Sequence, residues 1–175
     1  MFKKLANPFV AVILTLAMLG ATVGIAAAKS NTKNDNDIAA GDKVNMSIKS
    51  AGVMTRGGSN FEGDLELARV NSLDKEDVVT QSIRWAAQLL DVKLISDEKG
   101  VTHEHLNGNA YIFFDVAKGL DSAVMSGRLA IYKFDETRNV WVRLQTRIMN
   151  TSIKNTSQAV ARAMGAGSYG LGWVK

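Results

Sequence analysis

Short segments in which apolar and polar residues alternate dominate the chain from residue 43 onward, and they constrain the fold more than any other feature. In residues 43–49 (KVNMSIK) every second side chain is apolar, the pattern of a strand with one buried face. Residues 61–67 (FEGDLEL) repeat it, with the acidic residues on the opposite face. A turn over 56–60 (RGGSN) separates the two segments. We therefore expect half-buried strands joined by tight turns.

Further strand signals follow along the chain. Residues 91–96 carry Val92, Leu94 and Ile95 into a turn, and 111–116 (YIFFDV) is apolar on both faces, as in a central strand covered on two sides. Residues 128–134 and 140–145 flank a polar loop and predict a hairpin. The Gly-rich segment 165–175 predicts a closing strand in which glycines permit close packing or a bulge. Together these segments predict an antiparallel β-sandwich.

Two segments allow more than one structure. In residues 72–90 an acidic start is followed by Val79, Ile83, Ala86 and Leu90 on one helical face, which favours a helix at about 74–90 packed on the sheets. The acidic residues Asp74, Glu76 and Asp77 then suit its first turn. Residues 157–164 (SQAVARAM) fit a short helix or an Ala-rich strand equally well.

The N-terminal region has the three parts of a secretory signal. Lys3 and Lys4 precede an uncharged apolar run over 9–25, and three alanines end at Ala28. We expect a signal peptide at 1–28, a flexible polar leader at 29–42 and one domain at 43–175. The alternative is an uncleaved membrane anchor, since the run approaches the length that spans a bilayer. Membrane contact is expected only through this segment.

Charge and cysteine content limit the partners. After loss of Lys3 and Lys4 the chain holds 19 basic and 17 acidic residues, a balance that does not favour nucleic acid. The chain has no cysteine, so disulfides are excluded although export would permit them. An export signal without cysteine is typical of bacterial envelope proteins. The predicted location is the cell envelope, including the periplasm, or the extracellular space.

Residues 90–173 resemble β-sandwich modules of the immunoglobulin-like type found in bacterial secreted and cell-surface proteins. The resemblance rests on an acidic turn ending in glycine, a following strand, an aromatic hairpin and an aromatic closing strand, at 96–100, 109–116, 129–146 and 167–171. It implies a sandwich fold and a surface location, with the aromatic residues in the core. It implies no catalytic residue.

Candidate site residues are few. His103 and His105 share one face of an extended segment and are the only histidines, so a metal site would lack a third histidine or cysteine ligand. We predict no metal and no cofactor. Five aromatic residues could form a sugar-stacking platform, although alternate strand positions favour the core: Trp85, Tyr132, Trp141, Tyr169 and Trp173.

No nucleophile motif is present, and the carboxylates occupy turn or helix-start positions, so we expect a non-catalytic module. Its expected role is binding or scaffolding with other envelope proteins or polysaccharide. One alternative is a small carbohydrate-active enzyme whose carboxylates come together in the fold, among Glu62, Asp64, Glu66 and Asp115. Another is a lipid or small-ligand carrier with a pocket under the 72–90 segment.

Overall fold

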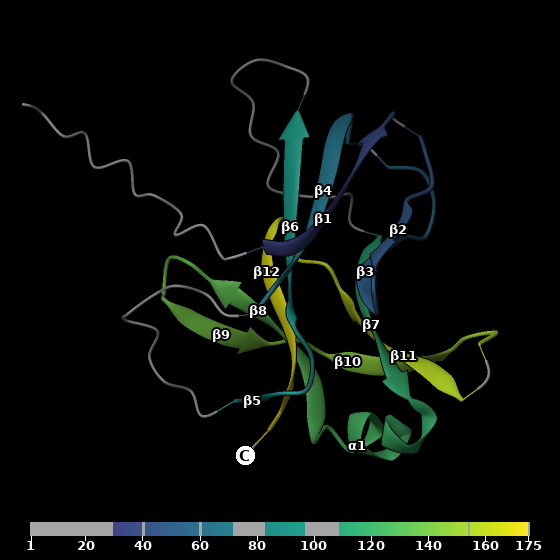
Figure 1. Ribbon diagram of the computed structural model, residues 1–175, viewed down its shortest axis with the longest axis vertical. Coiled ribbons are helices and arrows are strands. Elements are labelled where there is room, and N and C mark those ends of the chain that lie inside the picture. Colours follow the sequence, from purple (N-terminus) through teal and green to yellow (C-terminus); the bar gives the residue numbers. More distant parts are fainter. Residues whose placement is uncertain are drawn as a thin grey trace, which may run out of the picture.

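The chain folds into two antiparallel sheets packed face to face (Figure 1). A computed structural model describes residues 30–39, 41–59, 61–71, 83–96, 109–153 and 155–174. The larger sheet has the order β1-β4-β6-β12-β8-β9, with β5 also paired to β12. Its strands are β1 (Ser30–Ile38), β4 (Gly63–Val70), β5 (Arg84–Trp85), β6 (Leu89–Ser96), β8 (Leu129–Asp135), β9 (Val140–Arg143) and β12 (Gly167–Trp173).

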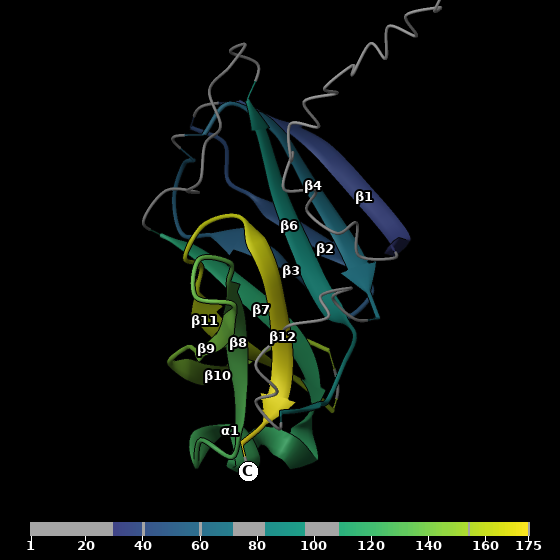
Figure 2. The same ribbon diagram turned by 90° about the vertical axis from the view of Figure 1, so that its left-hand side faces the viewer.

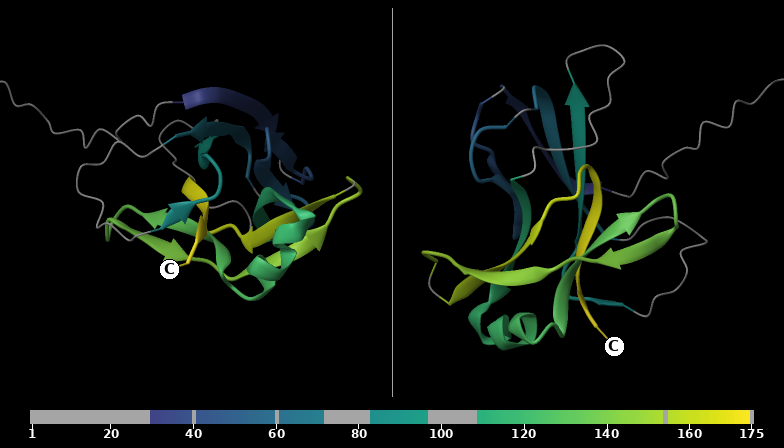
Figure 3. Two further views of the ribbon diagram at one scale, coloured as in Figure 1. Left: turned by 60° about the horizontal axis from the view of Figure 1, so that its bottom comes forward. Right: turned by 180° about the vertical axis from the view of Figure 1, so that it is seen from behind.

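The smaller sheet has the order β10-β11-β7-β3-β2, which places β7 at its centre. Its strands are β2 (Asn45–Ile48), β3 (Ala51–Thr55), β7 (Ala110–Ala117), β10 (Thr146–Asn150) and β11 (Thr156–Arg162). A 3-10 turn, η1 (Lys118–Leu120), leads into the short helix α1 (Asp121–Met125). Figures 2 and 3 show α1 at the end of the sandwich that also holds the C-terminus.

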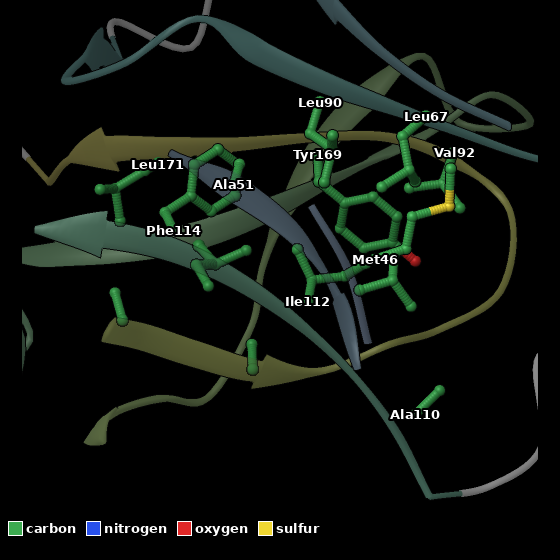
Figure 4. Packing of buried hydrophobic residues seen from close by; sticks show 14 of the residues in the cluster. Met46, Ala51, Leu67, Leu90, Val92, Ala110, Ile112, Phe114, Tyr169 and Leu171 are labelled. Carbon is green, nitrogen blue, oxygen red and sulfur yellow. The ribbon is translucent and has the colours of Figure 1, made fainter. Parts of the chain in front are cut away.

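The main core fills the space between the sheets. Leu65 and Leu67 of β4 face inward, as do Ile112 and Phe114 of β7, and all four side chains are buried. Figure 4 shows the Tyr169 and Phe114 rings between the strands of the two sheets. Alternate residues of each strand supply this core because successive side chains point to opposite faces. The predicted β-sandwich is confirmed.

Most of the predicted strands are confirmed. The segment 43–49 contains β2, the segments 61–67, 91–96 and 111–116 overlap β4, β6 and β7, and the closing segment contains β12. The hairpin is β8 paired with β9, and Asn139 in its loop has a φ of 54°. The segment 157–164 is strand as far as Arg162, where β11 ends, and β11 pairs with both β10 and β7. Strand β3 was not predicted.

The helix expected at 74–90 is wrong where the structure describes it. Residues 84–85 and 89–96 are strands, and residues 72–82 lie outside the described part of the chain. Trp85 pairs with Gly172 of β12, and Leu90 pairs with Tyr169. Backbone pairing along β12 therefore overrides the helical periodicity of this segment. The described residues contain one α-helix, α1, at a position for which we expected no helix.

The flexible leader expected at 29–42 is also corrected, because most of it is strand β1. Ser30 to Ile38 pair with β4 from Val70 back to Gly63, with one irregularity between Ser30 and Thr32. The composition of the segment indicated too little apolar surface for order. Strand addition at a sheet edge needs only backbone hydrogen bonds, and the buried Ile38 anchors one end.

The chain changes sheets immediately after the hairpin. We predicted one strand over 140–145, but β9 ends at Arg143 and β10 of the other sheet begins at Thr146. Leu144 donates its backbone N–H to the Ile131 carbonyl over 2.8 Å. The Ile131 N–H in turn donates to Thr146 Oγ1, also over 2.8 Å. This corner places Arg147 on the smaller sheet.

Candidate binding surface

Three of the five predicted aromatic residues gather on the outer face of the larger sheet. The centroids of the Trp85 and Trp141 rings lie 4.6 Å apart, and those of Trp85 and Tyr132 lie 6.0 Å apart. Phe134 joins the group with its centroid 5.2 Å from that of Trp141. The rings meet edge to face, the arrangement that aromatic quadrupoles favour.

Two glycines of β12 make room for Trp85. A Cβ atom on Gly170 would lie 2.5 Å from Trp85 Cζ3 and 2.7 Å from Leu89 Cδ2, and one on Gly172 would lie 3.1 Å from Trp85 Cε3. Both distances at Gly170 are shorter than real Cβ contacts allow. The Trp85 indole therefore packs directly on the backbone of the two glycines, which confirms that they permit close packing.

This aromatic cluster is a second small core and does not present a platform. Tyr132 is 6% exposed and Trp141 is 7% exposed, and Val70, Leu89 and Ala130 complete the buried group. Burial raises the pKa of the Tyr132 phenol above its usual value, and the Arg143 cation partly opposes that rise. Only Trp85 of the three predicted aromatics retains substantial exposed surface.

The other two predicted aromatics lie elsewhere. Tyr169 is fully buried in the main core, where its hydroxyl donates to the Gly165 carbonyl and accepts from the Met164 N–H at 3.1 Å. Burial raises its pKa well above the usual value for a phenol. Trp173 is half-buried and packs against the main core. Neither joins the outer cluster, so the structure does not bring the five residues together.

A different aromatic residue stands on the outer face of the smaller sheet. Tyr111 of β7 is half-buried, and the guanidinium carbon of Arg56 lies 5.2 Å from its ring centroid. The guanidinium carbon of Arg147 lies 5.3 Å from the same centroid. Arg56 comes from the β3 side of β7, and Arg147 reaches across β11 from β10. Both distances are within the range of cation–π attraction.

The surface around Tyr111 combines an apolar floor with polar groups. Phe113 and Val160 are outward-facing yet buried, and the Phe113 ring lies over Gly52, where an added Cβ would come within 2.7 Å of Phe113 Cζ. Arg162 pairs with Tyr111 in register. We call the surface formed by Arg56, Tyr111, Phe113, Asp115, Arg147, Gln158, Val160 and Arg162 the basic face.

The basic face was not predicted from the sequence. The alternation in 111–116 places Tyr111, Phe113 and Asp115 on one side of a strand, but that strand was expected to be covered on both faces. Phe113 is indeed buried, whereas Tyr111 and Asp115 are only half-buried. The arginines lie on other strands, and only the pairing register shows that they surround Tyr111. No signal in the sequence could have identified the group.

The predicted carboxylates do not converge. Asp64 and Glu66 alternate with buried leucines and lie on the outer face of the larger sheet, while Asp115 lies on the outer face of the smaller sheet. These two faces are on opposite sides of the sandwich. Glu62 is exposed just before β4. Asp115 accepts a hydrogen bond from Gln158 Nε2 at 3.0 Å.

Several other predicted positions lie outside the described residues. They are His103, His105, Asp74, Glu76 and Asp77. Within the described ranges, no group of three or more histidine, cysteine, aspartate or glutamate side chains is placed to hold a metal ion. The pocket expected under the 72–90 segment likewise involves residues that are not described.

A cleft of about 410 Å³ opens beside α1, and no residue of 83–90 lines it. Its lining combines the end of α1 with parts of β8, β9 and the corner before β10. Arg143 Nη2 donates to the Gly127 carbonyl over 2.8 Å at its rim. This guanidinium already donates a hydrogen bond to the protein's own backbone. It is therefore less available to a ligand than the arginines of the basic face are.

Comparisons of the chain with family models, with curated proteins and with solved structures found no match. Among the residues that the structure describes, no helix is long and apolar enough to cross a membrane.

Proposed function

We propose that the protein is an exported, non-catalytic module that binds at the cell envelope or outside the cell, and that the basic face is its binding surface. The observation that carries this proposal is the placement of Tyr111 between Arg56 and Arg147 on an open sheet face. An aromatic ring supplies flat apolar area at low entropic cost, and arginines supply several hydrogen-bond donors in fixed geometry. Tyrosine and arginine are also the residue types that dominate binding energy at protein surfaces.

The export part of the proposal rests on the N-terminal sequence. Cleavage after Ala28 would leave Lys29 as the first residue, and β1 begins at Ser30. A cut at this position therefore removes the apolar run and keeps every residue of β1. The mature chain would retain the complete larger sheet.

The separation of the carboxylates supports a non-catalytic role over the carbohydrate-active alternative. General acid–base hydrolysis of a glycoside uses two carboxyl groups on either side of one bond, no more than about 10 Å apart. Asp64 and Glu66 lie on the outer face opposite to that of Asp115, with the core between them, so neither can act with Asp115 on one sugar linkage. Asp64 and Glu66 themselves point side by side from one strand and do not face each other across a bond. Asp115 is the single described carboxylate on the basic face.

Retention on the protein's own cell-surface fraction tests the proposal. Purified mature protein should bind that fraction saturably, and Tyr111→Ala should lose most of the retention. Ile153→Ala is the control, because Ile153 is a large exposed side chain in the loop before β11. Thermal unfolding of each variant establishes that the fold is kept.

Two results would contradict the proposal. Equal retention of Tyr111→Ala and the wild-type protein would remove the basic face from binding. Release of sugar from envelope polysaccharide, abolished by Asp115→Asn, would show an enzyme.

A further inference from the structure

Charge is unevenly distributed over the two outer faces of the sandwich. The basic face carries Arg56, Arg147 and Arg162, all exposed, and Lys43 continues it at β2 because it alternates with buried Val44. Asp115 is the only acidic residue on this face within the described ranges. Residues 29–175 are close to neutral as a whole, so the remainder of this part of the chain carries a small negative excess. The net positive charge therefore lies on the basic face.

We infer that the ligand of the basic face is an acidic polysaccharide, one whose sugar rings carry carboxylate groups. This inference rests on the proposed function, since it names the ligand class of the same surface. The sugar ring packs on Tyr111, and its carboxylate accepts hydrogen bonds from the flanking guanidinium groups. Arginine pairs with carboxylate through two parallel hydrogen bonds, which gives orientation as well as affinity.

The dimensions of the basic face suit an extended chain. Arg56 follows β3 and Arg147 lies on β10, three strand positions away in the order β10-β11-β7-β3. The backbones are thus about 14 Å apart at the usual spacing of paired strands. The two guanidinium carbons, at 5.2 and 5.3 Å from the Tyr111 centroid, lie no more than about 10.5 Å from each other, an upper limit that is still longer than a single sugar ring. The floor between them is apolar and buried, formed by Phe113 and Val160. A polymer crossing the strands can thus meet a cation on either side of Tyr111.

Asp115 distinguishes an acidic polymer that also presents sugar hydroxyl groups from one that presents only anionic groups. It lies two residues from Tyr111 on the same face of β7, about 7 Å along the strand. Its carboxylate is held by Gln158 Nε2, so an acceptor and an amide are fixed beside the cations. Such a pair suits the hydroxyl groups of a sugar and repels a second nearby anion. Polymers that present anionic groups without hydroxyl groups beside them are therefore disfavoured.

Three probes separate the contributions of charge and sugar. Polygalacturonate carries both, its methyl-esterified form keeps the sugar backbone without the charge, and polyglutamate keeps the charge without the sugar. Binding of the mature protein to each is measured by affinity electrophoresis at low and high salt. We expect polygalacturonate to bind, with affinity falling at least about tenfold at high salt because exposed charges are screened. The other two should bind at least tenfold more weakly.

Paired variants test the residues. Arg56→Gln with Arg147→Gln should weaken polygalacturonate binding by about a hundredfold and flatten its salt dependence, since hydrogen bonds to charged groups are lost. Arg84→Gln with Arg138→Gln removes the same charge from exposed positions in β5 and in the turn between β8 and β9, and should change binding less than about twofold. Tyr111→Phe should bind like wild type, and Tyr111→Ala should not bind.

Each outcome has one meaning. If the esterified polymer binds as tightly as polygalacturonate, the carboxylate claim fails while the proposed binding function stands. If polyglutamate binds as tightly, the ligand is not recognised as a sugar and the inference fails. If neither glycan nor the cell-surface fraction is retained, the inference and the proposed function fail together.

Discussion

The guanidinium carbon of Arg69 lies 5.4 Å from the centroid of the Phe114 ring, between the two sheets. Arg69 follows Leu65 and Leu67 on the inner face of β4 and is 2% exposed. Its Nε and Nη1 atoms have no hydrogen-bond partner among the described residues. Burial lowers the pKa of this guanidinium from 12.5 to about 10, so it is charged at neutral pH. A buried cation without a full set of partners is destabilising unless other groups compensate for its lost hydration.

Replacing Arg69 with Met should therefore stabilise the fold. The change keeps much of the side-chain volume and removes the desolvated charge, so we expect the free energy of unfolding to rise by about 1–3 kcal/mol at pH 7. Urea unfolding measures it, and Arg138→Met at an exposed turn position should stay within about 0.5 kcal/mol. A loss of stability in Arg69→Met would show that the cation has favourable interactions inside the sandwich.

Adding one methyl group to β12 should displace Trp85. Gly170→Ala places a Cβ against Trp85 Cζ3 and Leu89 Cδ2, and we expect a cost of about 1–3 kcal/mol from overpacking. In the Trp85→Ala background the same change should lower the free energy of unfolding much less. A double-mutant cycle measures this coupling between the two positions. Gly119→Ala is the matched control, because a Cβ there meets nothing within 4 Å. If the losses of unfolding free energy from Gly170→Ala and Trp85→Ala are additive, the two residues are not in contact.

The buried aromatic cluster should contribute strongly to stability. Trp141→Ala should lower the free energy of unfolding by about 3–5 kcal/mol, because it empties a site that is 7% exposed. Chemical denaturation provides the value. Envelope binding should be unchanged wherever the variant stays folded, since the cluster and the basic face lie on different sheets. A cost below about 1 kcal/mol would place the indole in solvent and restore the platform hypothesis.

The stability of the protein should fall at alkaline pH through Tyr169. Its folded-state pKa is raised above the value of 10.0 expected when unfolded, so above pH 10 the unfolded chain loses a proton that the folded chain keeps. The stability from this group is complete below pH 10 and decreases as pH rises from there.

Tyr169→Phe should remove this part of the pH dependence. At pH 7 it should cost about 1–2 kcal/mol, because the hydroxyl bonds to Met164 and Gly165 are lost. Unfolding free energies measured between pH 7 and pH 11 give both the cost at pH 7 and the decline above pH 10. A decline above pH 10 as steep in the variant as in the wild type would assign the alkaline loss to other groups.

Processing should begin the mature chain at Lys29. Intact-mass measurement of protein recovered from the exporting cell should show loss of residues 1–28, as the small residues ending at Ala28 predict. Changing Ala26 and Ala28 to larger residues should block the cut and retain the precursor mass. Recovery of the wild-type protein with residues 1–28 attached would instead establish the uncleaved anchor.

The apolar-polar alternation was sufficient to predict a β-sandwich, because the two-residue period of a strand does not depend on distant residues. In β4, for instance, Leu65 and Leu67 are buried and Asp64 is exposed, as the sequence pattern alone predicts. The pattern could not predict β1, since an edge strand is ordered by main-chain pairing with β4 while its own side chains are polar. Nor could it exclude a helix before β6, because Ile83, Ala86 and Leu90 also fit a helical face.

What the sequence by itself determined is the class of fold, the alternating core positions and the hairpin of β8 and β9. What only the tertiary structure decided is which residues from different strands meet. Trp85 is placed by two glycines that are 85 and 87 positions further along the chain. Tyr111 is joined by Arg56 and Arg147 because antiparallel register brings β3, β7, β11 and β10 side by side. Local periodicity reports which face a side chain occupies, whereas register and sheet order, set by packing of the whole core, determine its neighbours.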